Sequence, residues 1–244
     1  MIANFPVWGK AGSIPKFEYT GTYEYIDDGG GNWRIKFLTS GVFTPLRDIV
    51  IDAFLVGGGG GTPIMPAGGW SSGAGGGYTR TDKGISLTAT AEYPIIVGAG
   101  GVGTSGGDTS AFGNAASGGN NGTSSRNSVQ HGGNGGSGGG EMHDDTAYDG
   151  GSDGSNGGKH FLGSGGVGQG TTTREFGEET GTLYAGGGGA YRSSRIYGKG
   201  GLGGGADGGT SAMDNTGGGA GGATRDSDTS GGSGIVVIRN TRAA

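Results

Sequence analysis

The chain has 244 residues, of which 68 are glycine, 6 are proline and none is cysteine. Glycine is thus about four times as frequent as in an average protein, but the scarcity of proline and the lack of a Gly-X-Y period exclude collagen. The absence of cysteine excludes disulfides and thiolate metal ligands, and the net charge of −5 argues against nucleic acid as the main partner.

The first third of the chain predicts β-structure. Aromatic and polar residues alternate over residues 17–25, and apolar and basic residues alternate over residues 33–37, after a turn signal at residues 27–32. This two-residue period is typical of half-buried strands, so we expect a hairpin in which glutamates of the first strand face cations of the second. Residues 39–45 indicate another turn region.

Further strands come next, and a glycine-rich region separates them from a last strand. Residues 49–56 are apolar on both faces, which indicates a central strand, and they are too short to cross a membrane. Residues 78–83, 85–89 and 93–97 predict further strands, and no segment has the period of a helix. Glycine tracts then continue up to an apolar strand at residues 235–239. This strand needs a sheet to join, so we interpret the glycine-rich region as an insertion between two strands of one sandwich.

A long glycine-rich segment is often a disordered linker. Here its two ends are tied by strands, it carries buried-type residues such as Phe112 and Phe176, and it lacks a monotonous Gly/Ser repeat. We therefore expect polyglycine II helices, which have three residues per turn and bond to neighbouring helices rather than internally. Ordering the backbone costs about 1–2 kcal/mol per residue, and only dense hydrogen bonding offsets that cost.

The predicted fold class is all-β: a small jelly-roll-like β-sandwich with an inserted polyglycine II helix bundle and essentially no α-helix. We assign residues 1–16 to an attachment segment and residues 17–97 with 235–240 to the sandwich. Residues 98–234 form the glycine-rich insertion, and residues 57–77 form a smaller excursion of the same kind. These boundaries follow the changes of composition along the chain.

No motif of the sequence predicts chemistry. Residues 98–103 match the G-x-G-x-x-G fingerprint of dinucleotide-binding proteins after a strand, but residues 104–108 cannot start an amphipathic helix. His143 stands beside two aspartates without a second histidine at ligand spacing, and Glu178 and Glu179 would point to opposite faces of a strand. We therefore expect no catalytic residue, no metal site and no cofactor, and a protein that is not an enzyme.

The segments between glycine tracts would emerge as turns at the ends of a rigid bundle, where binding residues usually lie. Tyr, Trp, Met and Arg are enriched in recognition surfaces, although some of them can instead pack on the bundle or the sandwich. The candidates for receptor binding are Met65, Trp70, Met142, His143, Tyr148, Phe161, Tyr191, Arg192, Arg195, Tyr197 and Met213.

Five segments, in this order, resemble the glycine-rich domain family found in phage and prophage tail proteins: residues 54–61, 75–79, 93–101, 182–189 and 231–239. The resemblance covers roughly residues 37–239. The glycine-rich region is also similar in composition to the polyglycine sandwich of long-tail-fibre adhesins in T-even-like phages, which recognise outer-surface receptors through distal loops. A jelly-roll sheet with polyglycine insertions also occurs in some receptor kinases, which agrees with the inserted architecture.

The resemblance implies a receptor-binding protein, or adhesin, at a phage tail tip or tail fibre. Its expected partners are a bacterial surface receptor, either a glycan or a surface protein, and other tail or fibre proteins. A homotrimer is one oligomeric option, and neither nucleic acid nor membrane insertion is expected. Phe5, Trp8 and Ile14 are the candidates for attachment to the virion. Because the start of the sequence has no signal-peptide pattern, we expect synthesis in the host cytoplasm and release as part of the virion.

Three other functions stand beside this one. A structural virion tail protein without receptor binding would keep its host range when residues 141–149 or 191–197 are substituted. An ice-binding protein would use a flat polyglycine surface, but charged turns and the lack of a regular Thr or Ala ladder speak against it. A depolymerase would need a catalytic constellation, and the sequence contains none that we recognise.

Overall fold

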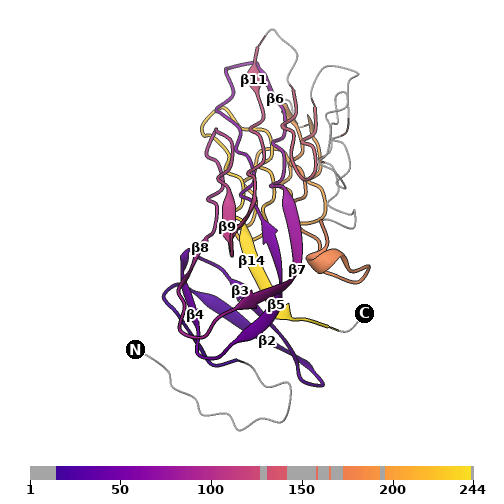
Figure 1. Cartoon of the computed structure of the whole chain (residues 1–244). Coiled ribbons are helices and arrows are strands. Elements are labelled where there is room, and N and C mark those ends of the chain that lie inside the picture. Colours follow the sequence, from indigo (N-terminus) through magenta and orange to yellow (C-terminus); the bar gives the residue numbers. More distant parts are fainter. Residues whose placement is uncertain are drawn as a thin grey trace.

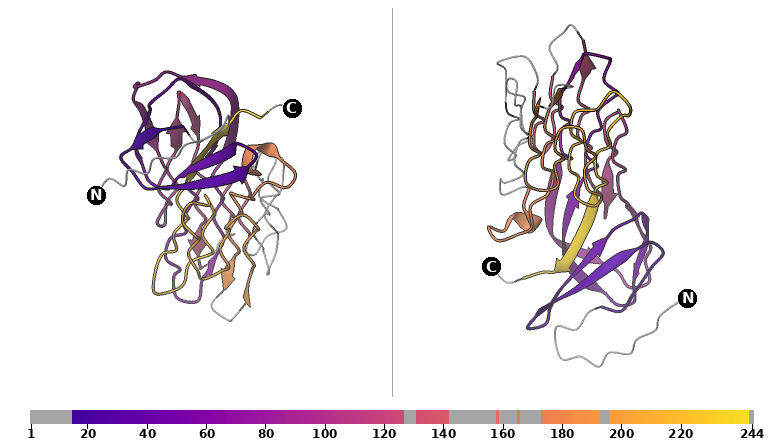
Figure 2. Two further views of the ribbon diagram at one scale, coloured as in Figure 1. Left: turned by 90° about the horizontal axis from the view of Figure 1, so that it is seen from below. Right: turned by 180° about the vertical axis from the view of Figure 1, so that it is seen from behind.

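The computed structural model describes residues 15–126, 131–141, 158, 165, 173–192 and 196–242. In these ranges the chain is all-β, and its helical part is one short 3₁₀ turn, η1 (Glu175–Gly177). Figure 1 shows a β-sandwich, which carries both ends of the described chain, and a bundle of extended glycine-rich segments that rises from it. The two views in Figure 2 show the same division. None of the described residues forms a helix with the length and apolar character that a membrane crossing requires.

Two five-stranded antiparallel sheets form the sandwich. The first has the order β1 (Phe17–Tyr19), β4 (Gly41–Pro45), β8 (Tyr93–Ile96), β9 (Thr109–Ala111) and β10 (Asn114–Ala116). The second has the order β2 (Tyr23–Gly29), β3 (Asn32–Phe37), β14 (Ile235–Asn240), β5 (Ile49–Val56) and β7 (Thr79–Leu87). Val236 of β14 lies opposite Phe37 on one side and Leu55 on the other. The prediction that the last apolar strand joins a sheet from the first hundred residues is confirmed.

The first two strands differ from the expected hairpin. The alternating segment 17–25 is not one strand: β1 pairs with β4 in the first sheet, and β2 pairs with β3 in the second. The chain changes sheets near Gly21, where a Cβ atom would lie only 2.7 Å from the carbonyl oxygen of Ser40. The hairpin of β2 and β3 is confirmed, and Glu24 lies opposite Lys36 as expected.

Three further expectations for the sandwich are wrong. The expected turn region 39–45 contains β4, whose Phe43 is completely buried between the sheets. The two strands expected at 78–83 and 85–89 are one strand, β7, with a shift of register opposite Ile51 and Ala53. The first sheet does not end at residue 97, because β9 and β10 extend it and bury Ala111 and Ala116 in the core.

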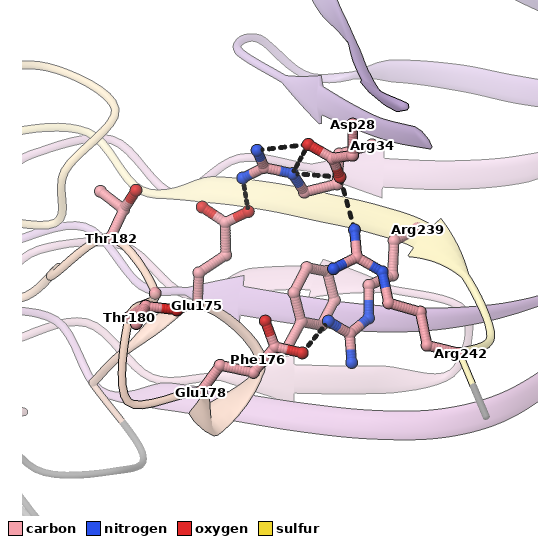
Figure 3. Close-up of a pocket in the computed structure, with 10 residues that line it drawn as sticks. Asp28, Arg34, Glu175, Phe176, Glu178, Thr180, Thr182, Arg239 and Arg242 are labelled. Atoms are coloured by element: carbon pink, nitrogen blue, oxygen red, sulfur yellow. Dashed lines mark hydrogen bonds and ion pairs between the residues drawn. The ribbon is translucent and has the colours of Figure 1, made fainter. Parts of the chain in front are cut away.

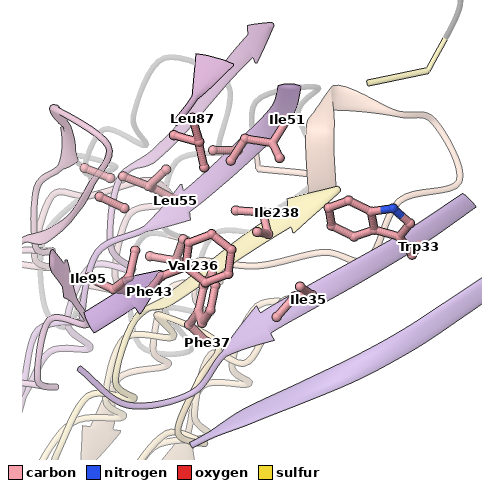
Figure 4. Packing of buried hydrophobic residues seen from close by; sticks show 13 residues of the cluster. Trp33, Ile35, Phe37, Phe43, Ile51, Leu55, Leu87, Ile95, Val236 and Ile238 are labelled. Carbon is pink, nitrogen blue, oxygen red and sulfur yellow. The ribbon is translucent and has the colours of Figure 1, made fainter. Parts of the chain in front are cut away.

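The core has two apolar clusters, one on each face of the second sheet. Between the sheets, β3, β4, β5 and β14 contribute most of the large side chains, as Figure 4 shows. On the outer side of the second sheet, Phe54 and Val237 pack against Phe176 and Tyr184, with the Phe54 and Tyr184 ring centroids 5.5 Å apart. Because β5 and β14 are covered on both faces, their residues are apolar at successive positions.

The glycine-rich bundle has a hydrogen-bond period of three residues. The N–H groups of residues 57–62 donate to three neighbouring segments in rotation, over 2.7 to 3.0 Å. One neighbour accepts from Gly57 through Tyr78 and from Gly60 through Gly75. A second accepts from Gly58 through Gly107 and from Gly61 through Thr104. The third accepts from Gly59 through Gly232 and from Thr62 through Thr229. Carbonyl groups of the same segment accept from residues 101, 119, 122 and 220. A period of three with all bonds to other segments is that of a polyglycine II helix.

The same bonds orient the bundle relative to the sandwich. The bundle begins next to the end of β5 and the start of β14, where residues 57, 77, 217 and 234 lie together. At the end of the bundle away from the sandwich lie residues 62, 72 and 229. The N–H groups of residues 57–62 and 72–78 all bond to neighbouring segments, and most of these residues are glycine because the segments approach one another closely. At Gly58 and Gly60, for example, a Cβ atom would lie 2.1 Å from a carbonyl oxygen.

Candidate functional site

A small sheet closes the end of the bundle away from the sandwich. We call it the tip sheet, and its strands have the order β11 (Ser124–Ser125), β6 (Trp70–Ser71), β12 (Tyr191–Arg192) and β13 (Ile196–Tyr197), all antiparallel. Figure 1 shows β6 and β11 at the extremity of the molecule, with the sandwich at the other end. The tip sheet thus joins three segments that are far apart in the sequence.

One face of the tip sheet packs on the bundle. Ser71 is completely buried, its Oγ lies 2.8 Å from Oγ of Ser124, and it accepts the N–H of Ala223 over 2.8 Å. Tyr191 pairs with Ser71 and therefore shares this inner face. Its ring lies against Gly209, where a Cβ atom would approach the ring to 3.2 Å. The inner face therefore attaches the tip sheet to the bundle.

The other face of the tip sheet, which we call the outer face, carries Trp70 at its centre. Trp70 pairs with Ser125 of β11 and with Arg192 of β12, so these three side chains lie on the face opposite Ser71. The guanidinium carbon of Arg192 lies 5.8 Å from the centroid of the Trp70 ring, in a cation–π contact. Arg126, which follows β11, donates its Nε–H to the carbonyl oxygen of Ala67 over 2.6 Å and so links β11 to the loop before Trp70.

The first residues of that loop, which spans residues 63–69, are hydrogen-bonded to the turn at residues 223–228. The N–H of Met65 donates to the carbonyl oxygen of Thr224 over 2.9 Å, and Asp228 accepts the N–H of Ile64 over 2.6 Å. Backbone and side-chain bonds therefore hold both sides of the loop, although it contains no strand before Trp70. Hydrogen bonds to neighbouring segments thus support the loop that leads into the outer face.

The sequence-predicted candidates fall into different places. Trp70, Tyr191, Arg192 and the backbone of Tyr197 are brought together in the tip sheet. Only Trp70 and Arg192 of these are placed on the outer face, because Tyr191 faces the bundle. The structure does not describe the candidates Met142, His143, Tyr148, Phe161, Arg195, Phe5, Trp8 and Ile14, nor the side chain of Tyr197.

Two methionine candidates are not where we expected them. Met65 is only 2% exposed, because its loop folds back on the turn at residues 223–228, so its side chain does not form part of the surface. Met213 is 67% exposed but lies on the flank of the bundle near the sandwich. Asn215, two residues later, donates to the carbonyl oxygens of Leu38 and Gly234 at the start of β14.

Arg126 is a tip residue that no sequence pattern singled out. It lies in one of the segments between glycine tracts, and its signal in the sequence is merely that of an arginine in such a segment. The pairing of β11 with β6, which brings Arg126 to Ala67 in the loop before Trp70, is a tertiary relationship that no local pattern indicates.

A second feature is a polar cavity of about 240 Å³ where η1 meets the second sheet of the sandwich. Figure 3 shows that arginines and carboxylates alternate around it. Arg34 pairs with Asp28 over 2.8 Å and with Glu175 over 2.6 Å, and Arg239 pairs with Glu178 and, over 3.2 Å, with buried Asp52. The hydrogen bond from Arg34 holds the pKa of Asp28 below its usual value.

The ion pairs that line this cavity attach the η1 segment to the sandwich. Its guanidinium groups are already paired with carboxylates, and the guanidinium carbon of Arg239 lies 4.1 Å from the centroid of the Phe176 ring. Phe176 has a φ of +58°, a strained value for a bulky residue, which the surrounding contacts maintain. Within the described residues no group of three His, Asp or Glu side chains is arranged to hold a metal ion.

A family model described as a glycine-rich domain matches residues 38–241. No curated protein matches the chain. The matched range includes β4 to β14, the whole glycine-rich bundle and the tip sheet.

Proposed function

The chain belongs to the glycine-rich domain family, and from this premise we propose that it is a receptor-binding protein of a bacteriophage tail tip or tail fibre. In this proposal the tip sheet contacts a receptor on the host cell surface, and the sandwich end attaches to other tail or fibre proteins. The protein acts by binding rather than by catalysis, and its place is the virion.

One observation supports the proposal most directly. Trp70 and Arg192 share the outer face of a small sheet at the end of an ordered bundle, and both ends of the described chain lie at the other end. Attachment near the chain ends would therefore leave the tip sheet projecting away from the virion. Tryptophan and arginine are among the residue types that most often dominate binding energy at interfaces.

The bundle explains why such a tip could bind well. The backbone bonds of residues 57–62 and 72–78 run to neighbouring segments on several sides. The two bonds from the tip sheet and its loop to residues 223 and 224 extend this network to the tip. A rigid support reduces the entropy that a binding surface loses on contact with its ligand, which favours affinity.

The proposal is tested by the binding of purified, fluorescently labelled protein to a panel of bacterial strains, with unlabelled protein as competitor. We expect saturable binding to a narrow set of strains. The double variant Trp70→Ala/Arg192→Ala should lose at least about tenfold in affinity, because both contact groups of the outer face are removed. Met213→Ala is the matched control, since Met213 is an exposed apolar residue outside the tip sheet.

Two results would count against the proposal. Equal binding by the double variant and the control would remove the tip sheet from the interaction. Absence of binding to every strain, with the protein also tested as a multivalent conjugate on beads, would favour the alternative of a structural virion tail protein without receptor binding.

A further inference from the structure

We infer that the outward side of the first sheet binds a second copy of this chain, so that two sandwiches pack sheet against sheet in a symmetric dimer. We call this side the lateral face, and on the sheet it comprises Val42, Pro94, Ile96, Ser110 and Ala115. The inference goes beyond the proposed function and does not depend on it. It uses only residues that the structure describes.

Alternation along the strands separates the lateral face from the core. Phe43 of β4, Ile95 of β8 and Ala111 of β9 are buried between the two sheets. Figure 4 shows the side chains of Phe43 and Ile95 within this cluster. Because successive side chains of a strand point to opposite sides of the sheet, the residues next to these three in their strands point outward.

The outward side chains form two rows across the sheet. Val42 of β4 lies opposite Pro94 of β8 in one row, and Ser110 of β9 lies opposite both Ile96 of β8 and Ala115 of β10 in the next. Ile96 is 52% exposed, and Pro94 and Ala115 are exposed as well. The solvent side of an antiparallel sheet is ordinarily polar, whereas four of these five residues are apolar. Such a surface marks an interaction site.

The glycine-rich bundle extends the lateral face. Residues 98–108 form two segments between β8 and β9, and the N–H of Gly107 donates to the carbonyl oxygen of Ala99 over 2.8 Å. These segments bond to residues 57–62, which follow β5, and so lie on them as the first sheet lies on the second. Ala99 is exposed and Val102, three residues later, is 59% exposed, so both project from one side of their helix.

The distribution of charge favours contact through the lateral face. None of the five side chains in its two rows is charged, and carboxylates lie at its border. Glu18 lies opposite Thr44 on the edge strand β1, and Asp108, which precedes β9, accepts the N–H of Gly118 over 2.9 Å. Each copy has a net charge of −5, so two copies repel one another at long range. At the lateral face they can meet without burying a charged side chain.

The chemistry of the lateral face matches a face of the same kind. Two sheets pack about 10 Å apart when uncharged side chains of one fit between those of the other. The outward side of the second sheet does not provide such a partner, because it carries Arg34, Arg239 and the η1 segment. The lateral face of a second copy does, and a two-fold axis brings the same residues of both copies together.

The size of the lateral face predicts a weak dimer. From Pro94 to Val102 it is about 25 Å long, because each residue of a strand or a polyglycine II helix adds about 3.1–3.3 Å. The five strands of the sheet, about 4.8 Å apart, make it about 20 Å wide. Two copies thus bury on the order of 1,000 Å², which is the lower limit of specific interfaces. We expect reversible association with a Kd of about 10–100 µM.

The test is sedimentation equilibrium of the full chain from about 5 to 500 µM, a range that brackets this Kd. We expect monomer at the lowest concentration and dimer at the highest. Raising NaCl should strengthen the dimer, because salt screens the repulsion between two negatively charged copies. Ile96→Asp, on the central strand β8, should weaken association at least about tenfold, because each copy then places a carboxylate in the interface.

A second substitution and a matched control keep the result specific. Ala115→Asp should act like Ile96→Asp, and both residues are exposed, so the variants should keep the circular dichroism spectrum of the parent protein. Leu202→Asp is the control, since Leu202 is a 64% exposed apolar residue in a segment that bonds to residues 186–187. It should leave the Kd unchanged. A chain that stays monomeric throughout overturns the inference, and so does an oligomer that both Ile96→Asp and Ala115→Asp leave intact.

Discussion

Gly59 and Gly218 approach one another so closely that a Cβ atom on Gly59 would lie 1.9 Å from the carbonyl oxygen of Gly218 and 2.4 Å from its carbonyl carbon. The Cα–H of Gly59 occupies this space, and contacts of this kind are worth about 0.5–1 kcal/mol each. The same relationship recurs between many segments of the bundle, so the glycine content of the chain follows from the spacing of its helices.

The first prediction concerns this contact. Gly59→Ala should destabilise the protein by about 3 kcal/mol or more, because the backbone of residues 217–218 must shift to admit the methyl group. The control is Gly84→Ala, where nothing lies within 4 Å and the cost is the positive φ of +70° alone, about 1–2 kcal/mol. Chemical denaturation measures both. Equal stability of the two variants would contradict the close packing of the bundle.

The second prediction concerns the order of the bundle. The amide of Gly58 donates to Gly107 over 2.9 Å and that of Gly75 to Asn120 over 3.0 Å, and both glycines are buried. Their hydrogen exchange should be as slow as that of amides in β5, whereas the exposed turn amide of Gly30 should exchange rapidly. Exchange followed by NMR gives the three rates. Rapid exchange at Gly58 and Gly75 would show that the glycine-rich region behaves as a flexible linker.

The third prediction concerns the buried ion pair of Arg239 and Asp52, which are 4% and 2% exposed. Arg239→Met should cost about 3–5 kcal/mol, because it leaves Asp52 buried without its cation. The double variant Asp52→Leu/Arg239→Met should be more stable than the sum of the single losses predicts. The exposed pair of Arg80 and Asp82 is the control, and its removal should cost less than about 1 kcal/mol. Additive losses at Arg239 and Asp52 would contradict the prediction.

The fourth prediction concerns alkaline pH. Burial raises the pKa of Tyr19 to about 12, from an ordinary value of about 10 in the unfolded chain. Its contribution to stability is therefore present below pH of about 10 and is lost as the pH rises towards about 12. Burial also raises the pKa of Tyr184, with Glu175 adding to the effect. Tyr19→Phe should flatten the alkaline fall of the unfolding free energy, and Tyr19→Phe/Tyr184→Phe should flatten it further. If neither variant changes the alkaline fall of the unfolding free energy, other titrating groups cause it.

Several parts of the fold could be predicted because they depend on local patterns. The hairpin of β2 and β3 follows from alternation around a turn signal, and the double-sided burial of β5 follows from its continuous apolar run. The location of β14 followed from a physical requirement, since a strand without a partner leaves its backbone groups unpaired. Strand β4 escaped prediction because its few apolar residues give no clear alternation, although Phe43 is completely buried.

For the candidate site, too, the sequence indicated some features and the tertiary structure decided the others. Residue type alone singled out Trp70, Tyr191 and Arg192 in segments between glycine tracts. Whether each side chain faces solvent or the bundle depends on the register of strands that lie far apart along the chain. That register also brings Arg126 to the loop before Trp70, where it bonds to Ala67, and the fold of this loop buries Met65. Neither result can be read from the neighbouring residues.

The sequence by itself determined that this protein is all-β and that its glycine-rich region belongs inside the fold, because strand periodicity and the need to pair the last strand are local or topological facts. Only the tertiary structure decided which glycine segments are neighbours and which side chains form the outer face. The physical reason is that glycine has no side chain to specify a partner. The neighbours are selected by the three-residue rotation of backbone hydrogen bonds and by the positions of the few residues, such as Ala74 and Ser71, that fit between them.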